Sequence, residues 1–255
     1  MTAVTTLGDD VFVVREPTTQ VEVYDAVSCT LQRHITVDGL TGNRPHGLAA
    51  CDHYKCLYVS DWSLSLYRTE LTGSNAVMKW SVARNPGGLS VNRAHNVVVV
   101  CYGENKLQEY TTHGSLVREI SIQAGMASLW HAVQLSTGDY VVSQCHPMLS
   151  DVIVVGVDGQ VRHRYGHSQT SGVGKMNYPR SLAVTKNDDI LVADSGNNRI
   201  LSMNSSLSSV QELTLPVDGG LLVPVGLFLD ESRGRLYVGE GSGSHRVLVF
   251  DNVKL

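Results

Sequence analysis

The sequence predicts an all-β fold, a six-bladed β-propeller, and three observations lead to this prediction. A short apolar strand of similar pattern recurs six times, with about 40 to 50 residues between successive copies. Each copy belongs to a unit of four short strands, separated by turns rich in Asp, Asn and Gly. Apolar residues spaced three and four apart, which would predict helices, are nearly absent. Repeated four-stranded antiparallel units of this length are typical of propeller blades.

The clearest unit contains residues 190–201. An apolar run, Ile-Leu-Val-Ala, gives way to Asp-Ser-Gly-Asn-Asn and resumes as Arg-Ile-Leu, which predicts two strands joined by a tight turn. Residues 57–67 and 98–107 repeat this arrangement more weakly. The second strand of each unit is therefore expected at residues 11–14, 57–59, 97–100, 140–142, 190–192 and 236–238.

Polarity changes across each unit as a radial arrangement requires. The first strands, such as 88–91 and 226–229, are apolar and rich in small residues, whereas the fourth strands, such as 31–37 and 210–215, are more polar. First strands should crowd around a common axis while fourth strands face water. The sixth unit reaches its third strand at 247–250, so its outer strand is missing within this chain. We expect flanking sequence to supply that strand; a bare edge is the alternative.

Length and composition place the chain among globular proteins. With 255 residues, 42% of them hydrophobic and 17% charged, it can bury a large core, and the repetition favours one domain over residues 1–255. The net charge of −4 gives no long-range attraction to phosphate backbones, so nucleic acid is not expected as a partner. Neither a membrane segment nor a leader peptide is recognisable, and the cellular compartment stays open.

The five cysteines do not have the spacing of a zinc site. Cys51 and Cys56 flank a predicted hairpin turn, where facing positions can bring two side chains close enough for a disulfide. The alternative is that all five are free thiols buried as small apolar residues.

Two segments resemble the NHL-repeat family. Residues 178–200 include Tyr-Pro-Arg-Ser-Leu-Ala-Val and Val-Ala-Asp-Ser-Gly-Asn-Asn-Arg-Ile, and residues 44–61 begin with Arg-Pro-His-Gly-Leu-Ala. The resemblance implies a six-bladed propeller over essentially the whole chain. It implies no single function, because such propellers include protein-interaction modules, RNA-binding platforms, extracellular modules and a lyase of the peptidylglycine-amidating type.

The turn after the second strand contains residues that are expected to stabilise its conformation. Asp61 and Asp194 are expected to accept hydrogen bonds from backbone groups of the turn that follows each of them. Gly196 and Asn197 suit positive φ angles in the second of these turns. We assign these residues to the scaffold rather than to a ligand.

His46 and His131 are the sharpest candidates for chemistry. Both stand at the head of a first strand, two blades apart, so both are expected to point into the central channel. The resembling lyase holds a catalytic zinc with histidines from alternating blades, but the third position here is Val225, and two imidazoles make a weak zinc site. We therefore expect no metal or other cofactor. The structural alternative is that both histidines bond backbone carbonyls or water.

Arg180 occupies the same position in the fifth unit, and Gly87 occupies it in the third. A channel mouth with one arginine and two histidines suits an anion or a polar peptide terminus, because a guanidinium offers a fork of donors to a carboxylate. An arginine that bridges adjacent blades is the structural alternative.

Loops between second and third strands gather on one face of a propeller. Here they contain Trp62, Tyr102, His146 and Glu240. Aromatic side chains are the usual anchors of binding surfaces, which makes Trp62 the most interesting of the four. Packing of Trp62 on the neighbouring blade is an equal alternative.

These features predict a non-catalytic binding module, a scaffold that recognises a protein or peptide ligand. The expected binding residues are His46, Trp62, Tyr102, His131, His146, Arg180 and Glu240. We expect a monomer, alone or within a larger multidomain chain.

Two other functions stay open as alternatives. One is a metal-dependent lyase centred on His46 and His131. The other is an RNA-binding propeller, for which the basic clusters at 162–164 and 233–235 are small. No Ser-His-Asp arrangement in a nucleophile elbow and no His-Glu-x-x-His motif is present.

Overall fold

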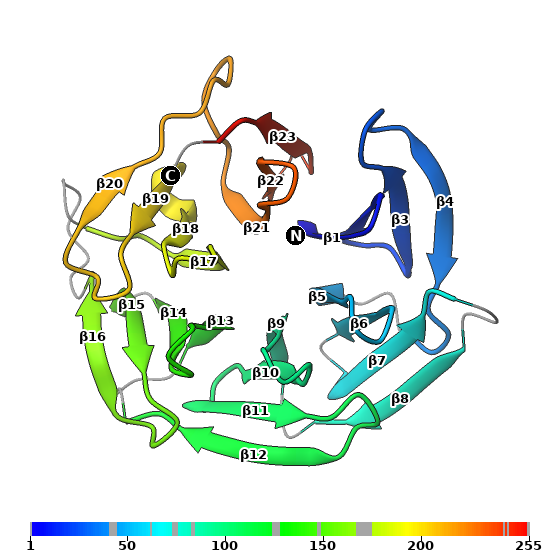
Figure 1. Ribbon diagram of the computed structural model, residues 1–255, viewed down its shortest axis with the longest axis horizontal. Coiled ribbons are helices and arrows are strands. Elements are labelled where there is room, and N and C mark those ends of the chain that lie inside the picture. The colour runs from blue at the N-terminus through cyan, green and yellow to red at the C-terminus, as the bar shows by residue number, and fades with distance from the viewer. Residues whose placement is uncertain are drawn as a thin grey trace.

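The computed structural model describes residues 2–40, 45–61, 63–72, 76–82, 85–123, 128–146, 149–166, 175–241, 243 and 245–253. They form six antiparallel sheets arranged as blades around a central axis (Figure 1). Five blades have four strands each, and blade six has three within the described residues. The predicted all-β, six-bladed propeller with an incomplete last blade is therefore confirmed.

The strands are numbered in chain order and run from the inner to the outer strand of each blade. Blade one contains β1 (Thr2–Leu7), β2 (Asp10–Arg15), β3 (Gln20–Asp25) and β4 (Leu31–Thr36), and blade two contains β5 (Pro45–Cys51), β6 (Cys56–Asp61), β7 (Ser65–Glu70) and β8 (Val77–Ser81). Blade three contains β9 (Pro86–Val91), β10 (Val97–Cys101), β11 (Lys106–Tyr110) and β12 (Leu116–Ser121), and blade four contains β13 (Leu129–Gln134), β14 (Tyr140–His146), β15 (Leu149–Val155) and β16 (Val161–Tyr165). Blade five contains β17 (Pro179–Val184), β18 (Ile190–Asp194), the 3-10 helix η1 (Ser195–Asn197), β19 (Arg199–Met203) and β20 (Val210–Glu212), and blade six contains β21 (Pro224–Asp230), β22 (Arg235–Glu240) and β23 (Val247–Asp251).

Burial follows the predicted gradient from the axis outward. Every residue of the second strands β10 and β18 is buried, because both faces of these strands pack against a neighbouring blade. In the outer strands β4 and β12 the first four residues are exposed, and only the penultimate residue, Ile35 or Ile120, is buried. A single apolar residue of the outer strand thus inserts into the gap between two blades.

The apolar core lies in the gaps between blades rather than at the axis. Between blades three and four, for example, Val100 and Ile120 pack with Tyr140 and Val142. The gap between blades one and six is filled in the same way by a cluster that includes Val13 and Tyr237. Side-chain packing is therefore the contact that closes the ring within the described residues.

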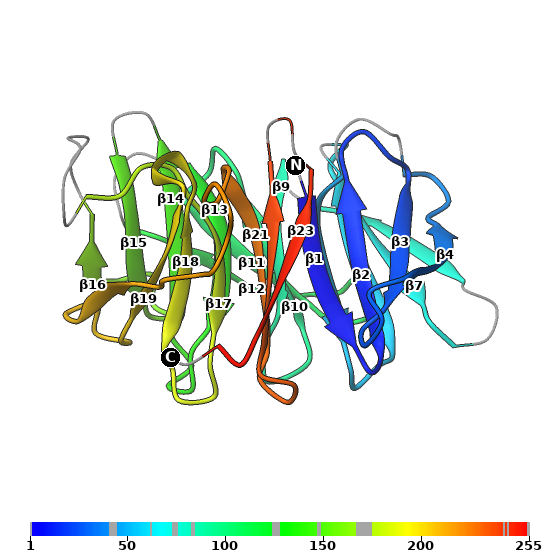
Figure 2. The same cartoon turned by 90° about the horizontal axis from the view of Figure 1, so that it is seen from above.

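Two arginines of blade six reinforce this closure. Arg233 forms an ion pair with Asp9 of blade one, and Arg235 donates a hydrogen bond to the carbonyl of Ala26. In Figure 2 blade one lies beside blade six, and β1 packs against β21 and β22. Within the described residues, the first and last blades thus meet through side-chain contacts, and no strand of one belongs to the sheet of the other.

Serine hydroxyls tie three blades to the next one at the head of the inner strand. Ser60 accepts a hydrogen bond from the N–H of Gly47 (3.0 Å) and donates to the carbonyl of Gly87 in blade three (3.2 Å). Ser143 accepts from the N–H of His131 (3.2 Å) and donates to the carbonyl of Arg180 in blade five (2.5 Å). Both serines face an irregular register in the inner strand, so they satisfy backbone groups that the β ladder leaves unpaired.

Ser195 makes the corresponding contact from blade five, where its hydroxyl donates to the carbonyl of Pro224 in blade six. These three serines are buried, with exposed fractions of 1% or less. A buried hydroxyl bonded to the backbone of the next blade fixes the spacing between consecutive inner strands.

The turn after the second strand differs in part from its prediction. Asp61 does accept from a backbone N–H of the following turn, that of Ser63 (2.9 Å). The expectation for Asp194 is wrong in detail, because its partners are the N–H of Asn177 (2.7 Å), which precedes the blade, and the side chains of Asn197 and Arg199 (2.8 Å each). Asp194 therefore ties the entry of its blade to the turn.

The positive φ angle of this turn falls on Asn198 (54°) and not on Gly196 or Asn197. Gly196 is required for another reason. An added Cβ would lie 2.5 Å from the side chain of Asn177, so a side chain here would have to push that residue away.

All five cysteines are free. Cys51 and Cys56 face each other across the β5–β6 pair, as the hairpin prediction requires, and both are buried. Burial raises the pKa of the Cys56 thiol, so it is protonated at neutral pH. Within the described residues no helix is long and apolar enough to cross a membrane.

The serine bridges give a stability prediction. Ser60→Ala should lower the free energy of unfolding by about 1–3 kcal/mol, because the Gly47 N–H and the Gly87 carbonyl lose a buried partner. Urea denaturation measures the change. Ser206→Ala, at an exposed turn position, is the control and should stay within about 0.5 kcal/mol of the unmodified protein. Equal stabilities of the two variants would contradict the role given to Ser60.

Candidate functional site at the upper mouth of the channel

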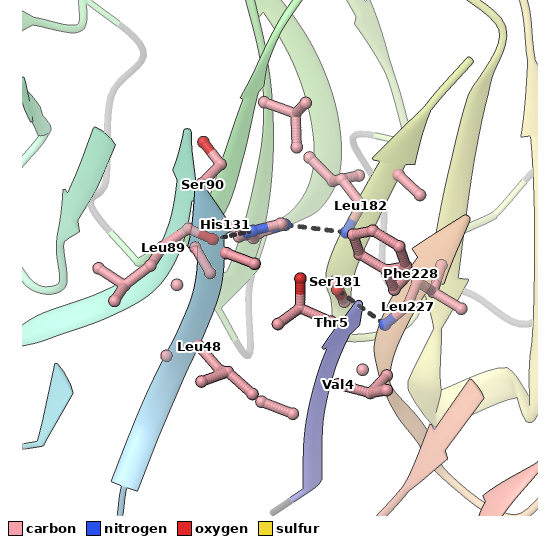
Figure 3. A pocket seen from close by; sticks show the side chains of 18 of the residues that line it. Val4, Thr5, Leu48, Leu89, Ser90, His131, Ser181, Leu182, Leu227 and Phe228 are labelled. Carbon is pink, nitrogen blue, oxygen red and sulfur yellow. Dashed lines mark hydrogen bonds between the residues drawn. The ribbon is translucent and has the colours of Figure 1, made fainter. Parts of the chain in front are cut away.

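The six inner strands, β1, β5, β9, β13, β17 and β21, surround a central channel of about 230 Å³ (Figure 3). We call upper the face at which β5, β9, β13, β17 and β21 begin, which also carries the loops between second and third strands. Much of the channel wall is aliphatic or aromatic and includes Val4, Leu48, Leu89, Leu182, Leu227 and Phe228. Polar and charged side chains gather at the upper mouth.

His131 lines the channel and links three blades. Its Nδ1 accepts a hydrogen bond from the N–H of Leu182 in blade five (3.0 Å), and its Nε2 lies 3.0 Å from the carbonyl of Leu89 in blade three (Figure 3). This geometry assigns the proton to Nε2, because a carbonyl can only accept. Withdrawal from bulk water lowers the pKa of His131, so the ring is neutral at physiological pH. Both nitrogens are engaged by backbone, as in the structural alternative.

His46 is buried at the head of β5, with an exposed fraction of 5%. Burial lowers its pKa to about 4, assisted by the positive charge of Arg180 and opposed by an interaction with the Gly87 backbone and by the charge of Glu16. The ring packs edge-on against Trp130, with 4.7 Å between ring centroids. His46 is therefore a neutral wall of the mouth at physiological pH.

Trp130 is the centre of the upper mouth. Three of the predicted binding residues contact it: His46 as described, Tyr102 edge-on at 6.0 Å between centroids, and Arg180, whose guanidinium carbon lies 4.6 Å from the centre of the indole. The structure thus brings together side chains from blades two, three and five around one residue of blade four. We call Trp130, Tyr102, His46 and Arg180 the mouth cluster.

Arg180 is the charged member of the mouth cluster. The described residues include every Asp and Glu of the chain, and none of these carboxylates forms an ion pair with Arg180. Its Nε is buried without an acceptor within the described residues. The guanidinium lies over the indole, and within the described residues no carboxylate occupies its N–H donors. Most other arginines of the described chain pair with a carboxylate, so Arg180 stands out.

Cys145 lies beside this guanidinium. Burial raises the pKa of its thiol to about 11, although Arg180 acts in the opposite direction. The thiol is therefore protonated at neutral pH and is not an activated nucleophile.

The remaining predicted residues do not join the mouth cluster. Glu240 is fully buried, where it accepts a hydrogen bond from the N–H of Leu222 (2.8 Å) and forms an ion pair with Arg246 (2.9 Å). It occupies the end of its second strand as Asp61 and Asp194 do, which makes it part of the scaffold. His146 ends β14 at the upper face and is half-buried. Trp62 lies outside the described residues.

The zinc site of the resembling lyase is not reproduced by these residues. Both nitrogens of His131 already bond backbone groups, and the third position is Val225, which lines the channel. Within the part of the chain that the structure describes, no group of three or more His, Cys, Asp or Glu side chains could hold a metal ion.

The basic clusters considered for RNA are compensated by acidic partners. Arg162 pairs with Asp158, and Arg164 pairs with Asp151. Arg233 pairs with Asp9 and Asp230, while Arg235 pairs with Asp251. Paired arginines present little net positive charge to a phosphate backbone.

Residues 176–201, from the entry of blade five to β19, match the NHL repeat. The chain contains an NHL repeat. No curated protein sequence matches it. In this repeat the turn is held by Asp194, Asn197 and Arg199, as described above. The predicted resemblance is thus confirmed for the unit in which it was clearest.

Solved structures with the same fold confirm the propeller assignment. A protein of unknown function from Bacteroides caccae matches with a TM-score of 0.75 and 15% identity, over 94% of this chain and 89% of that one. Kuenenia stuttgartiensis hydrazine synthase matches with a TM-score of 0.70 and 17% identity, over 96% of this chain and 74% of that one. Virginiamycin B lyase from Staphylococcus aureus matches with a TM-score of 0.67 and 9% identity, over 98% of this chain and 83% of that one. At these identities the likeness concerns the fold alone.

The depressed pKa of His46 gives a prediction for stability against pH. The folded state favours the neutral ring of His46, whereas the unfolded chain binds a proton there below about pH 6.5. The stabilisation that His46 contributes to folding is therefore complete above pH 6.5 and is lost as the pH falls towards 4. Between pH 7 and pH 4.5 the loss should be about 2 kcal/mol. His46→Gln should remove this part of the pH dependence, which urea denaturation at the two pH values measures. An unchanged slope in the variant would contradict the assignment.

Proposed function

We propose that this propeller is a non-catalytic binding module that receives a protein or peptide at the upper face, with an anionic group of the ligand bound by Arg180. The observation that carries the proposal is the stacking of Arg180 on Trp130 without any carboxylate partner. A guanidinium held over an indole is already positioned, so a ligand carboxylate that meets its N–H donors gains hydrogen bonds at little cost in side-chain entropy. Every protein or peptide chain carries one such group at its C-terminus.

The aromatic members of the mouth cluster support the same function. Trp130 and Tyr102 are half-buried, so each keeps part of its ring at the surface, where aromatic residues commonly anchor a binding partner. Trp62 belongs to the loop between β6 and β7 and stays a predicted contact. His131, with both nitrogens engaged, contributes by holding the inner strands in place.

The titratable groups of the mouth favour binding over catalysis. A general acid or base acts best with a pKa near the working pH, whereas the pKa of His46 is about 4 and that of Cys145 is about 11. The pairing of the basic clusters with carboxylates likewise favours a peptide ligand over RNA.

The test uses an acetylated peptide of alanines with a free C-terminal carboxylate and the same peptide as its C-terminal amide. Isothermal titration should show the free acid binding about 10- to 100-fold more tightly, because hydrogen bonds to a charged group contribute about 1.5–3 kcal/mol. Arg180→Gln should remove this preference, and Tyr102→Ala should weaken binding of both peptides. The melting temperature should stay within a few degrees in both variants.

Arg33→Gln is the matched control, since Arg33 lies on the exposed outer strand of blade one and pairs with Asp10. It should leave both affinities unchanged. Equal affinity of the acid and the amide for the unmodified protein, or retained preference in Arg180→Gln, would reject the proposal.

A further inference from the structure

The central channel directly below the mouth cluster is large and mostly apolar. Trp130 lines the channel, and its indole lies under the guanidinium of Arg180, so the channel and the anion position meet at one residue. His46, which packs on Trp130, lines the same channel. A ligand group bound at Arg180 thus lies next to the entrance of the channel.

Two polar side chains of the channel wall are occupied by backbone groups. His131 uses both ring nitrogens on the backbone of Leu89 and Leu182. The Ser181 hydroxyl accepts a hydrogen bond from the N–H of Leu227 (3.0 Å; Figure 3). An ordered water requires two to four polar partners, and this part of the wall has few to offer. Apolar groups need none.

The size of the channel sets the size of such a group. An apolar protein cavity of about 150 Å³ is enough to bind benzene, and the channel of about 230 Å³ exceeds it. The aliphatic wall suits a branched aliphatic or aromatic side chain. It includes Leu48, Leu89, Leu182 and Leu227. A group of the size of leucine or phenylalanine is therefore accommodated.

We propose that the channel is a specificity pocket for the apolar group next to the ligand's carboxylate. The inference rests on the proposed function and narrows its ligand to a carboxylate joined to an apolar group no larger than the side chain of phenylalanine. A protein or peptide chain that ends in leucine or phenylalanine has this chemistry, and so does a free arylalkanoic acid. The carboxylate lies on Arg180, and the apolar group fills the channel past Trp130.

A series of acetylated glycine peptides tests the inference, with Gly, Ala, Leu, Phe or the larger 4-phenyl-phenylalanine as the last residue and a free carboxylate throughout. Isothermal titration should show affinity rising from Gly to Phe by about 10- to 100-fold, the gain expected from burying one such side chain. The 4-phenyl derivative should lose this gain, because it exceeds the channel. 3-Phenylpropanoate separates the two sources: affinity equal to that of the Phe peptide identifies a small acid, and weaker affinity identifies a chain terminus.

Ser90→Phe tests the same pocket from the protein side. Ser90 lines the channel and its hydroxyl has no partner within the described residues, so the substitution breaks no hydrogen bond. The variant should lose the preference for Phe over Gly while its affinity for the Gly peptide is unchanged, and Ser90→Ala should retain the preference. The ligand series decides the question even if Ser90→Phe does not fold.

The two proposals fail in different ways. Equal binding of the Gly and Phe free acids, both tighter than their amides, would overturn the specificity pocket and leave the binding function standing. Binding of the Phe peptide that does not depend on its carboxylate would overturn the proposed function and, with it, the joint site.

Discussion

The structure depends on holding six inner strands at a fixed distance from one another around the central channel, which no helix or sheet of the described chain fills. Buried side chains achieve this: Ser60, Ser143 and Ser195 each donate to a carbonyl at the head of the next blade's inner strand, and His131 bonds the backbone of both neighbouring blades. Each of these contacts runs from a side chain to the backbone, so it fixes the position of a strand rather than of another side chain. The channel keeps its width because the backbone at its rim is held in this way.

The same contacts explain why a binding site forms where it does. The serine bridges and the irregular register place the heads of β13 and β17 side by side, with the carbonyl of Arg180 bonded to Ser143. The side chain of Arg180 then extends over Trp130 of the preceding blade. A charged residue is thereby positioned by its own main chain and by a neighbouring ring, without a counter-ion of its own.

The number of blades and most strand positions could be predicted, because alternation and turn residues are local properties that repeat. The fourth strand of blade five, expected over 210–215, ends at Glu212. The N–H of Leu213 still bonds the carbonyl of Ile200, and the side chains of Leu213 and Leu215 pack in a cluster with residues of blade six. His46 and Arg180 could be grouped because they occupy equivalent places at the head of an inner strand, and Tyr102 could be added because its loop lies on the same face. The central role of Trp130 could not be predicted, because it depends on partners from three other blades. The position of this indole, directly before His131 at the head of an inner strand, was nevertheless a usable indication. Glu240 was assigned to the binding face, yet its alignment with Asp61 and Asp194 pointed to the buried role it has.

The three-stranded last blade has a mechanical consequence. In a propeller whose final sheet mixes strands from both ends of the chain, pulling the ends apart shears a row of backbone hydrogen bonds together. Here, within the described residues, the join between the first and last blades consists of an apolar cluster and two arginine contacts. The contacts of such a join act one by one, so the strength of this join depends on the apolar area that its side chains bury and not on a row of backbone bonds.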